Sequence, residues 1–329
     1  MKIIVIGDGG WGTAFSLVLC DSLHEVTLWS SFPDYAQQMA DTRTNPKFLP
    51  NVSIPESIRI LHRNSPVTWS DYDLIINAVP TQFVRPIFSE LAFVLPADIP
   101  IVSLSKGLEI STGQRVSVIL QTLFPGRPIL VLSGPSHAEE VARKLPTAIT
   151  LAGEDHELVK ELQSRLSTEY FRVYSNHDVI GVELGGAIKN VISLAAGMVD
   201  GLGFGDNTKS ALITRGLAEI IRLGVILGAE RDTFYGLSGL GDLITTSVSH
   251  HGRNWWCGYQ IGQGKTLPQI EKETGKVIEG VYTVLAVQAM QHQHHLEMPI
   301  TQQVYQVIYQ DKSPRTALLE LMRRSSKSE

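Results

Sequence analysis

A glycine-rich turn lies near the start of the chain, where Gly7, Gly9 and Gly12 form the pattern G-x-G-x-x-G. The turn follows a short apolar run, Lys2–Ile6, and precedes a segment with helical spacing, Thr13–Cys20. In this context the glycines permit a tight turn, close approach of a pyrophosphate and close helix–strand packing. The N–H groups at the start of the helix attract phosphate oxygens. The pattern therefore favours a dinucleotide site over a glycine-rich turn without a ligand.

The residue that distinguishes NAD from NADP is expected at the end of the second strand, here Glu25–Trp29. Ser30 and Ser31 follow that strand, and the first acidic residue, Asp34, comes later. Either serine can hydrogen-bond a ribose hydroxyl or a phosphate. The sequence leaves the choice between the two cofactors open.

Lys189 has no acidic residue three or four positions away on its expected helix, where Gly185, Gly186, Ile192 and Ser193 stand. One interpretation is a lysine whose ammonium reaches the surface along the helix. The alternative is a desolvated active-site lysine that donates or accepts a proton.

Further candidates follow predicted strands, where ligands of doubly wound sheets bind. Lys106 comes after the strand Pro100–Ser103 and suits an anionic substrate, unless it is a solvated loop lysine. Gly134 and Ser136 follow the strand Ile129–Leu132 and offer backbone N–H groups.

Two candidates lie later in the chain. Asp242 stands in an apolar, glycine-rich stretch and is either a helix cap or a site residue, because an unpaired buried carboxylate is costly. Gly252, Arg253 and Asn254 follow, and arginine binds phosphate in a bidentate manner.

The histidine clusters, 250–251 and 292–295, lack the flanking ligands of a zinc motif, so no metal is expected. The net charge of −5 argues against a nucleic-acid partner, and Cys20 and Cys257 are expected to be reduced thiols. Neither a signal peptide nor an uncharged membrane-length run is apparent, so no membrane insertion and a cytoplasmic location are expected.

These candidates must be positioned by two kinds of architecture. Apolar strand runs alternate with helical segments to about residue 175, and their further members are Asp73–Val79 and Ala148–Leu151. Small-residue helices, Asp178–Val199 and Asn207–Leu227, and further helical stretches follow. We predict an α/β protein with a Rossmann-like, doubly wound, mostly parallel sheet in residues 1–178 and an all-α domain in residues 179–329.

Several segments, in order, resemble the bacterial-type NAD(P)-dependent glycerol-3-phosphate dehydrogenases over essentially the whole chain. They are GDGGWGTA (7–14), SKGLE (105–109), SGPSHAEEVA (133–142), ELGGAIKNVISLAAG (183–197), GFGDNTKSALITRGLAE (203–219), GLSGLGDLITT (236–246), GRN (252–254) and VIEGVYT (277–283).

The resemblance implies interconversion of dihydroxyacetone phosphate and sn-glycerol 3-phosphate with NAD(P)H, which supplies phospholipid synthesis. It implies that Lys189 is the general acid/base. The implied substrate residues are Lys106, Gly134, Ser136, Lys189, Asp242, Gly252, Arg253 and Asn254. The implied cofactor residues are Gly7, Gly9, Gly10, Trp11, Gly12, Ser31, Lys106, Ala138, Arg253, Val277 and Glu279.

The chain departs from the family pattern at a few positions. Ser31 replaces a common basic residue, Gly10 and Gly252 replace common serines, and Trp255 and Trp256 replace basic residues. Two rival functions remain: a dehydrogenase of another hydroxy acid or alcohol, and a catalytically silent nucleotide-binding sensor. A homodimer is compatible with the helical domain, although no interface is diagnostic.

Overall fold

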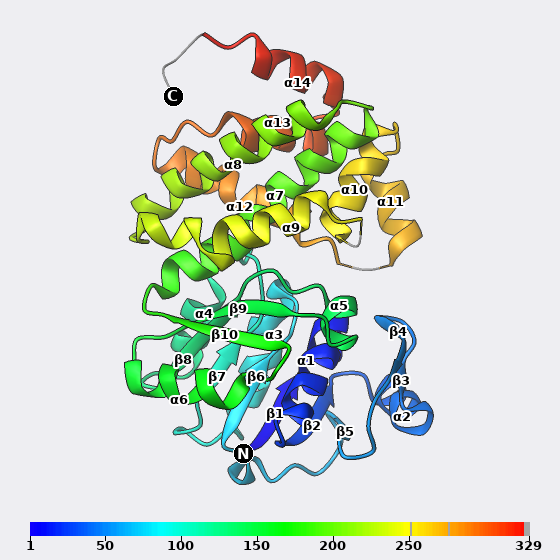
Figure 1. Ribbon diagram of the computed structural model, residues 1–329, viewed down its shortest axis with the longest axis vertical. Helices are drawn as coiled ribbons and strands as arrows, with labels where there is room; N and C mark the ends of the chain where they lie inside the picture. Colours follow the sequence, from blue (N-terminus) through cyan, green and yellow to red (C-terminus); the bar gives the residue numbers. More distant parts are fainter. Residues whose placement is uncertain (251, 276, 326–329) are drawn as a thin grey trace. The chain divides into compact units, whose positions relative to one another are not determined.

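The computed structural model describes residues 1–250, 252–275 and 277–325. The described chain divides into two compact units: residues 1–106 with 115–183, and residues 107–114 with 184–329 (Figure 1). The units thus differ from the predicted domains at residues 179–183 and in the short segment 107–114. The predicted domains are continuous in sequence, whereas residues 107–114 belong to the second unit although the residues on either side of them belong to the first.

The first unit is built on an eight-stranded sheet with the order β10-β9-β8-β7-β6-β1-β2-β5. Its strands are β1 (Lys2–Ile6), β2 (Glu25–Ser30), β5 (Arg59–His62), β6 (Leu74–Asn77), β7 (Ile101–Ser103), β8 (Ile129–Ser133), β9 (Thr147–Ala152) and β10 (Phe171–Asn176). All neighbouring pairs are parallel except β8 and β9, which are antiparallel. The predicted mostly parallel, doubly wound sheet is confirmed.

Helices cover both faces of this sheet. They are α1 (Gly10–Asp21), α2 (Pro33–Thr42), α3 (Thr81–Leu91), α4 (Val116–Leu123), α5 (Ala138–Ala142) and α6 (His156–Leu166). Alternate residues of β1 point to opposite faces. Ile3 and Val5 join a core with side chains of α1 and α6, whereas Ile4 and Ile6 join a second core with side chains of α3 and α4.

A small antiparallel pair, β3 (Thr44–Asn45) and β4 (Leu49–Ser53), follows α2. Its Asn45 is fully buried and donates from Nδ2 to the backbone oxygen of Asp8 (2.8 Å) and to Thr13 Oγ1 (2.7 Å). This pair therefore braces the glycine-rich turn, and the sequence did not predict it.

In the second unit, the described residues from 184 onward form helices joined by loops, and the segment 107–114 forms turns. Its helices are most of α7 (Val179–Gly201), α8 (Asp206–Ile226), α9 (Asp242–Val248), α10 (Arg253–Gly262), α11 (Leu267–Thr274), α12 (Glu279–Gln293), α13 (Pro299–Tyr309) and α14 (Pro314–Met322). A 3₁₀ turn, Arg231–Tyr235, and a π-turn, Leu237–Gly241, precede α9. The predicted all-α region is confirmed within the described residues.

Glycines allow α7 and α10 to pack with their backbones almost in contact. A Cβ at Gly197 of α7 would lie 2.0 Å from the carbonyl oxygen of Trp255, and one at Gly258 of α10 would lie 2.0 Å from that of Leu194. This close packing fixes α7, the helix that carries Lys189, against α10, which begins with Arg253.

By length and composition α7 is apolar enough to span a membrane, but 89% of its most apolar stretch is buried inside the structure. A helix in the core of a folded domain can have the same length and composition.

Candidate active site

The glycine-rich turn joins β1 to α1 at the carboxyl edge of the sheet. Gly7 has a φ of +118°, which only glycine adopts without strain. A Cβ at Gly12 would lie 2.1 Å from the Gly7 carbonyl oxygen, so a glycine here allows α1 to pack closely against the turn. Gly9 instead faces open space, with nothing within 4 Å of its would-be Cβ.

The start of α1 is left available to an anion. Gly9 is its N-cap and provides no side-chain cap for the first N–H groups. An uncapped helix N-terminus beside the open space at Gly9 suits a pyrophosphate. These residues therefore fit a dinucleotide, which is the role that the sequence predicts for Gly7, Gly9 and Gly12.

The remaining predicted cofactor residues of this unit have different surroundings. A Cβ at Gly10 would lie 2.6 Å from the carbonyl oxygen of Phe48 and 3.7 Å from the Cβ of Ala138. The loop before β4 thus explains why a serine does not fit at position 10, and Ala138 lies beside the turn. Trp11 packs on Phe15, with ring centroids 5.7 Å apart, and its Nε1 has no hydrogen-bond partner among the described residues.

Ser30 and Ser31 differ more than the sequence indicates. Ser30 is fully buried and its Oγ donates to Asp8 Oδ2 at 2.6 Å, so its hydroxyl is already engaged by the protein. Ser31 is half-buried, which is compatible with its predicted contact. Burial raises the pKa of Asp8, and the hydrogen bond from Ser30 opposes that increase.

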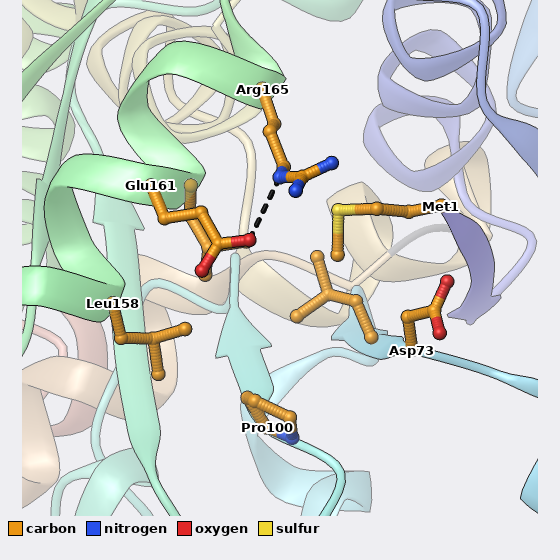
Figure 2. Close-up of a pocket in the computed structure, with 8 residues that line it drawn as sticks. Met1, Asp73, Pro100, Leu158, Glu161 and Arg165 are labelled. Atoms are coloured by element: carbon orange, nitrogen blue, oxygen red, sulfur yellow. Dashed lines mark ion pairs between the residues drawn. The ribbon is translucent and has the colours of Figure 1, made fainter.

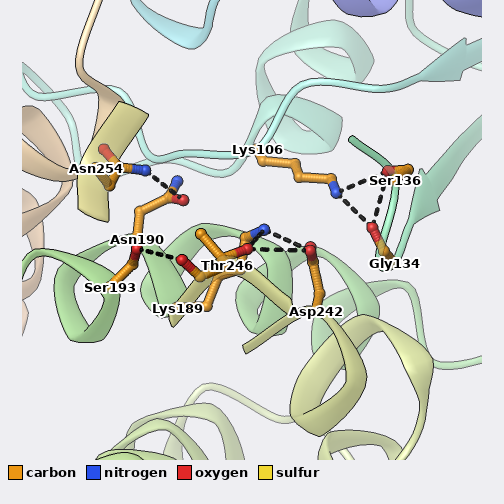
Figure 3. A network of polar contacts seen from close by, with 9 residues as sticks. All are labelled: Lys106, Gly134, Ser136, Lys189, Asn190, Ser193, Asp242, Thr246 and Asn254. Carbon is orange, nitrogen blue, oxygen red and sulfur yellow. Dashed lines mark hydrogen bonds and ion pairs between the residues drawn. The ribbon is translucent and has the colours of Figure 1, made fainter. Parts of the chain in front are cut away.

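A second polar group of the same unit lies beyond β7 and β8. Lys106 Nζ donates to the carbonyl oxygen of Gly134 at 2.7 Å and lies 3.3 Å from Ser136 Oγ (Figure 3). The structure therefore brings together these three predicted residues. Ser136 also donates to the Gly134 oxygen at 2.9 Å, so the group is held before any substrate binds.

A buried network that the sequence did not reveal supports the loop carrying Lys106. Asn77, the last residue of β6, donates from Nδ2 to Ser103 Oγ at 3.0 Å and to Ser105 Oγ at 2.9 Å. Ser105 in turn donates to the carbonyl oxygen of Val79 at 2.6 Å. The signal available in the sequence was a polar residue, Asn77, inside the apolar run 73–79.

In the helical unit, Lys189 is buried and paired. Its Nζ lies 2.5 Å from Asp242 Oδ1 and 2.6 Å from Thr246 Oγ1, both on α9 (Figure 3). Lys189 is 5% exposed and Asp242 is 2% exposed, so neither is a surface residue. The interpretation of Lys189 as a lysine that reaches the surface is therefore wrong, and the acidic partner that its own helix lacks lies on another helix, 53 positions away.

An amide pair lies in the same unit. Asn254 Nδ2 donates to Asn190 Oδ1 at 2.8 Å, and the backbone N–H of Gly280 donates to Asn254 Oδ1 at 2.9 Å. Asn190 follows Lys189 on α7 and was not singled out from the sequence. The pair connects α7, α10 and the first turn of α12.

Arg253 is the exposed first residue of α10, and Gly252 is the N-cap of that helix. Arg253 NH1 donates to the carbonyl oxygen of Val277 at 2.9 Å, which brings two predicted cofactor residues together. Glu279 begins α12 two positions later. Trp255, by contrast, is structural: it is buried, and its Nε1 donates to Asp200 at 2.6 Å.

A cavity of about 380 Å³ lies elsewhere in the first unit, between the starts of β1 and β6 and helix α6. Met1, Asp73, Pro100 and the ion pair of Glu161 with Arg165 line it (Figure 2). It opens at the amino edge of the parallel strands, whereas ligands of such sheets bind at the carboxyl edge. We therefore assign it no part of the active site.

No group of three or more histidine, cysteine or acidic side chains that could hold a metal ion occurs within residues 1–250, 252–275 and 277–325. His250 packs edge-on against Trp255, and His251 lies outside the described residues. His292 lies 2.9 Å from Gln288 Nε2. Burial raises the pKa of Cys257 to about 12, so this thiol is inert.

Two family models match the chain. The N-terminal model of NAD-dependent glycerol-3-phosphate dehydrogenase matches residues 2–159, and the C-terminal model matches residues 178–319. The chain belongs to this family. The enzyme class and the NAD(P) cofactor predicted from the resemblance are thereby confirmed.

Individual relatives agree with the family assignment. Glycerol-3-phosphate dehydrogenases [NAD(P)+] of Lactococcus lactis subsp. lactis and of a Geobacter species are 45% and 46% identical, covering 100% of this chain and 97% and 98% of those proteins. The crystal structure of the Coxiella burnetii enzyme is similar with a TM-score of 0.94 and 36% identity, covering 98% of this chain and 99% of that one.

Proposed function

We propose that the chain interconverts dihydroxyacetone phosphate and sn-glycerol 3-phosphate with NAD(P)H, and that Lys189 is the general acid/base. The observation that carries this assignment is the buried ammonium of Lys189, held between Asp242 and Thr246. A lysine fixed in this way presents its proton in a constant direction, which suits transfer to a substrate oxygen.

Reduction of the ketone requires a hydride on carbon and a proton on oxygen. A bound reduced nicotinamide supplies the hydride to the carbonyl carbon. Lys189 Nζ donates the proton to the carbonyl oxygen, and its positive charge stabilises the negative charge that develops there. In the reverse direction neutral Lys189 accepts the hydroxyl proton. Asp242 and Thr246 hold the ammonium in place in both directions.

The phosphate of the substrate needs cationic and N–H donors. Arg253 offers a guanidinium at the start of α10, whose N-cap Gly252 provides no side-chain cap for the first N–H groups. Asn254 adds an amide from the next position, and Lys106, with Gly134 and Ser136, offers an ammonium and a hydroxyl in the other unit. Binding energy from the phosphate then orients the carbonyl for reaction.

For the cofactor we propose Gly7, Gly9 and Gly12 at the pyrophosphate. Gly10, Trp11, Ser31 and Ala138 are proposed as further contacts from the first unit. Lys106, Arg253, Val277 and Glu279 are proposed to contact the cofactor as well. The support is the geometry of the turn, the proximity of Ala138 to Gly10, and the bond between Arg253 and Val277.

Three broader proposals follow from this activity. The product supplies phospholipid synthesis, and the enzyme works in the cytoplasm without inserting into a membrane, which the burial of α7 supports. Self-association as a homodimer is favoured by half-exposed apolar side chains of the helical unit, Val225 and Ile226 on α8 and Ile244 and Val248 on α9.

Substrate choice tests the proposal. With NADH or NADPH in excess, we expect kcat/KM for dihydroxyacetone phosphate to exceed that for unphosphorylated dihydroxyacetone by about 10³-fold or more, because the charged phosphate contacts are lost. Arg253→Gln is expected to reduce this preference, and Lys265→Gln, a change of a half-exposed lysine paired with Glu273, is the control. Equal rates with the two ketones would contradict the assignment and favour a dehydrogenase of another alcohol.

A further inference from the structure

A carboxylate reaches the end of β2 from an unexpected part of the chain. Asp8 is the second residue of the glycine-rich turn and is 7% exposed, and Ser30 is the last residue of β2. The 2.6 Å hydrogen bond from Ser30 Oγ to Asp8 Oδ2 joins them. In dinucleotide-binding sheets the end of this strand carries the acid that binds the adenosine ribose. No acidic residue follows β2 directly in this sequence, but the carboxylate of Asp8 lies beside the end of β2 in the structure.

The surroundings of Ser30 hold this carboxylate in one orientation. Ser30 Oγ accepts the backbone N–H of Phe32 at 3.0 Å, and its single proton lies closer to Asp8 Oδ2 (2.6 Å) than to its other acceptor, the carbonyl oxygen of Phe32 (3.3 Å). On the other side of the turn, Asn45 donates to the backbone oxygen of Asp8 at 2.8 Å. A carboxylate has about four lone-pair sites, so Asp8 retains acceptor capacity for a ligand hydroxyl.

The charges around Asp8 favour a hydroxyl over a phosphate. Ser31, the next residue after Ser30, is neutral where a cation would be needed to neutralise a 2′-phosphate. The exposed Lys47 places a positive charge near Asp8 and opposes this preference, but its ammonium lies over the ring of Phe48, 4.9 Å from the ring centroid. A phosphate dianion placed near the Asp8 carboxylate would meet a like charge in a mostly buried position.

We propose that Asp8 makes this enzyme select NADH over NADPH, by accepting a hydrogen bond from the ribose 2′-hydroxyl and by repelling the 2′-phosphate. The inference rests on the proposed function, since it concerns the cofactor of that site. Ser30 is a positioning residue, which acts through Asp8.

The experiment measures dissociation constants of NADH and NADPH by titration calorimetry on the full chain, without dihydroxyacetone phosphate. We expect the native chain to bind NADH at least tenfold more tightly than NADPH. Asp8→Asn, which keeps the shape and removes the charge, is expected to lower the ratio of the two constants at least tenfold. The matched control is Asp34→Asn, because Asp34 is an exposed acid in the first turn of α2, and its ratio is expected to stay within twofold of native.

Several outcomes would overturn the inference: a native chain that binds both dinucleotides equally or prefers NADPH, an unchanged ratio in Asp8→Asn, or an equal change in Asp34→Asn. Asp8→Ser provides a second neutral variant if Asp8→Asn does not fold. Because the titrations contain no ketone, failure to reduce dihydroxyacetone phosphate would refute the proposed function and leave the inference on Asp8 standing.

Discussion

At the scale of single residues, the buried ion pair of Lys189 with Asp242 joins α7 to α9. Lys189 was singled out because its own helix offers it no acidic partner, and it is indeed buried. Its true partner, Asp242, was also singled out, as an acid in an apolar stretch that needs a partner. The sequence identified Lys189 and Asp242 separately as candidates. It could not predict that they pair, because the pairing depends on how α7 and α9 pack.

Asp8, unlike Lys189 and Asp242, was not singled out from the sequence. The residues that follow the second strand are Ser30 and Ser31, so no acid stands at the chain position where the ribose-binding acid is expected. The carboxylate arrives instead from the turn itself and is recognisable only by its bond to Ser30. Thr246, Asn190 and Asn77 were missed for the same reason: polar residues within apolar helices and strands gain meaning only from their neighbours in space.

Glu219 provides a prediction at this scale. It is buried in α8 and accepts bonds at the start of α13 from the backbone N–H of Ile300 (2.6 Å) and from the N–H and hydroxyl of Thr301 (3.1 and 2.9 Å). Burial raises its pKa from 4.5 to about 7, although these bonds and Arg222 oppose the increase. The folded state therefore holds this proton more strongly than the unfolded state does.

Since the pKa is raised on folding, the stabilising contribution of protonated Glu219 is complete below about pH 4.5 and is lost as pH rises through about 7. The shift corresponds to about 3 kcal/mol. Denaturant unfolding between pH 4.5 and 8 should show a free energy of unfolding that falls more steeply in the native chain than in Glu219→Gln, which cannot titrate. Identical pH slopes in the two proteins would exclude this role.

Helices and strands were predictable wherever one physical pattern dominates. Lys2–Ile6 is a continuous β-branched run and has the same bounds as β1, and the predicted helix 178–199 corresponds to α7 (Val179–Gly201). The edge strands β5 and β10 and the pair β3–β4 were missed because most of their residues are exposed or half-buried and form no continuous apolar run. The antiparallel pairing of β8 with β9 could not be predicted either, because the apolar pattern of a buried strand does not indicate its direction in the sheet.

The packing of α7 on α10 leads to a prediction for a single methyl group. A Cβ at Gly197 would lie 2.0 Å from the carbonyl oxygen of Trp255, which is backbone and cannot rotate away. Gly197→Ala should therefore lower the free energy of unfolding by about 2 kcal/mol or more, measured by denaturant unfolding. The expected effect on turnover is also a loss, because α7 carries Lys189.

Gly205→Ala is the matched control for this change. Gly205 precedes α8 with extended backbone (φ −84°) and open space where a Cβ would lie. We expect it to change stability by less than about 1 kcal/mol. If Gly197→Ala were no more destabilising than Gly205→Ala, the close contact between α7 and α10 would not be rigid.

At the scale of the whole molecule, the sequence predicted both architectures and their order: a doubly wound α/β region followed by an all-α region. The family assignment followed from ordered motifs spread over both. The return of residues 107–114 to the helical unit was not predictable, because nothing in their composition distinguishes them from a loop of the first unit. The predicted bounds at residue 178 stay a prediction.

The proposed reaction takes its acid/base, Lys189, from the helical unit. Its central step is the transfer of a proton by Lys189. A variant that loses only this group should therefore still bind the cofactor, whose pyrophosphate is assigned to the glycine-rich turn. A silent nucleotide-binding sensor would bind the cofactor in the same way but would show no turnover to lose.

The most direct test is turnover of dihydroxyacetone phosphate by Lys189→Met, together with the dissociation constant of NADH and a thermal unfolding curve. General acid–base groups contribute about 10²–10⁴-fold to rate, so we expect kcat to fall by about 10³-fold while the dissociation constant stays within twofold of native. Lys265→Met, a change of a half-exposed lysine, should leave both values unchanged. A folded Lys189→Met enzyme with near-native kcat would contradict the account.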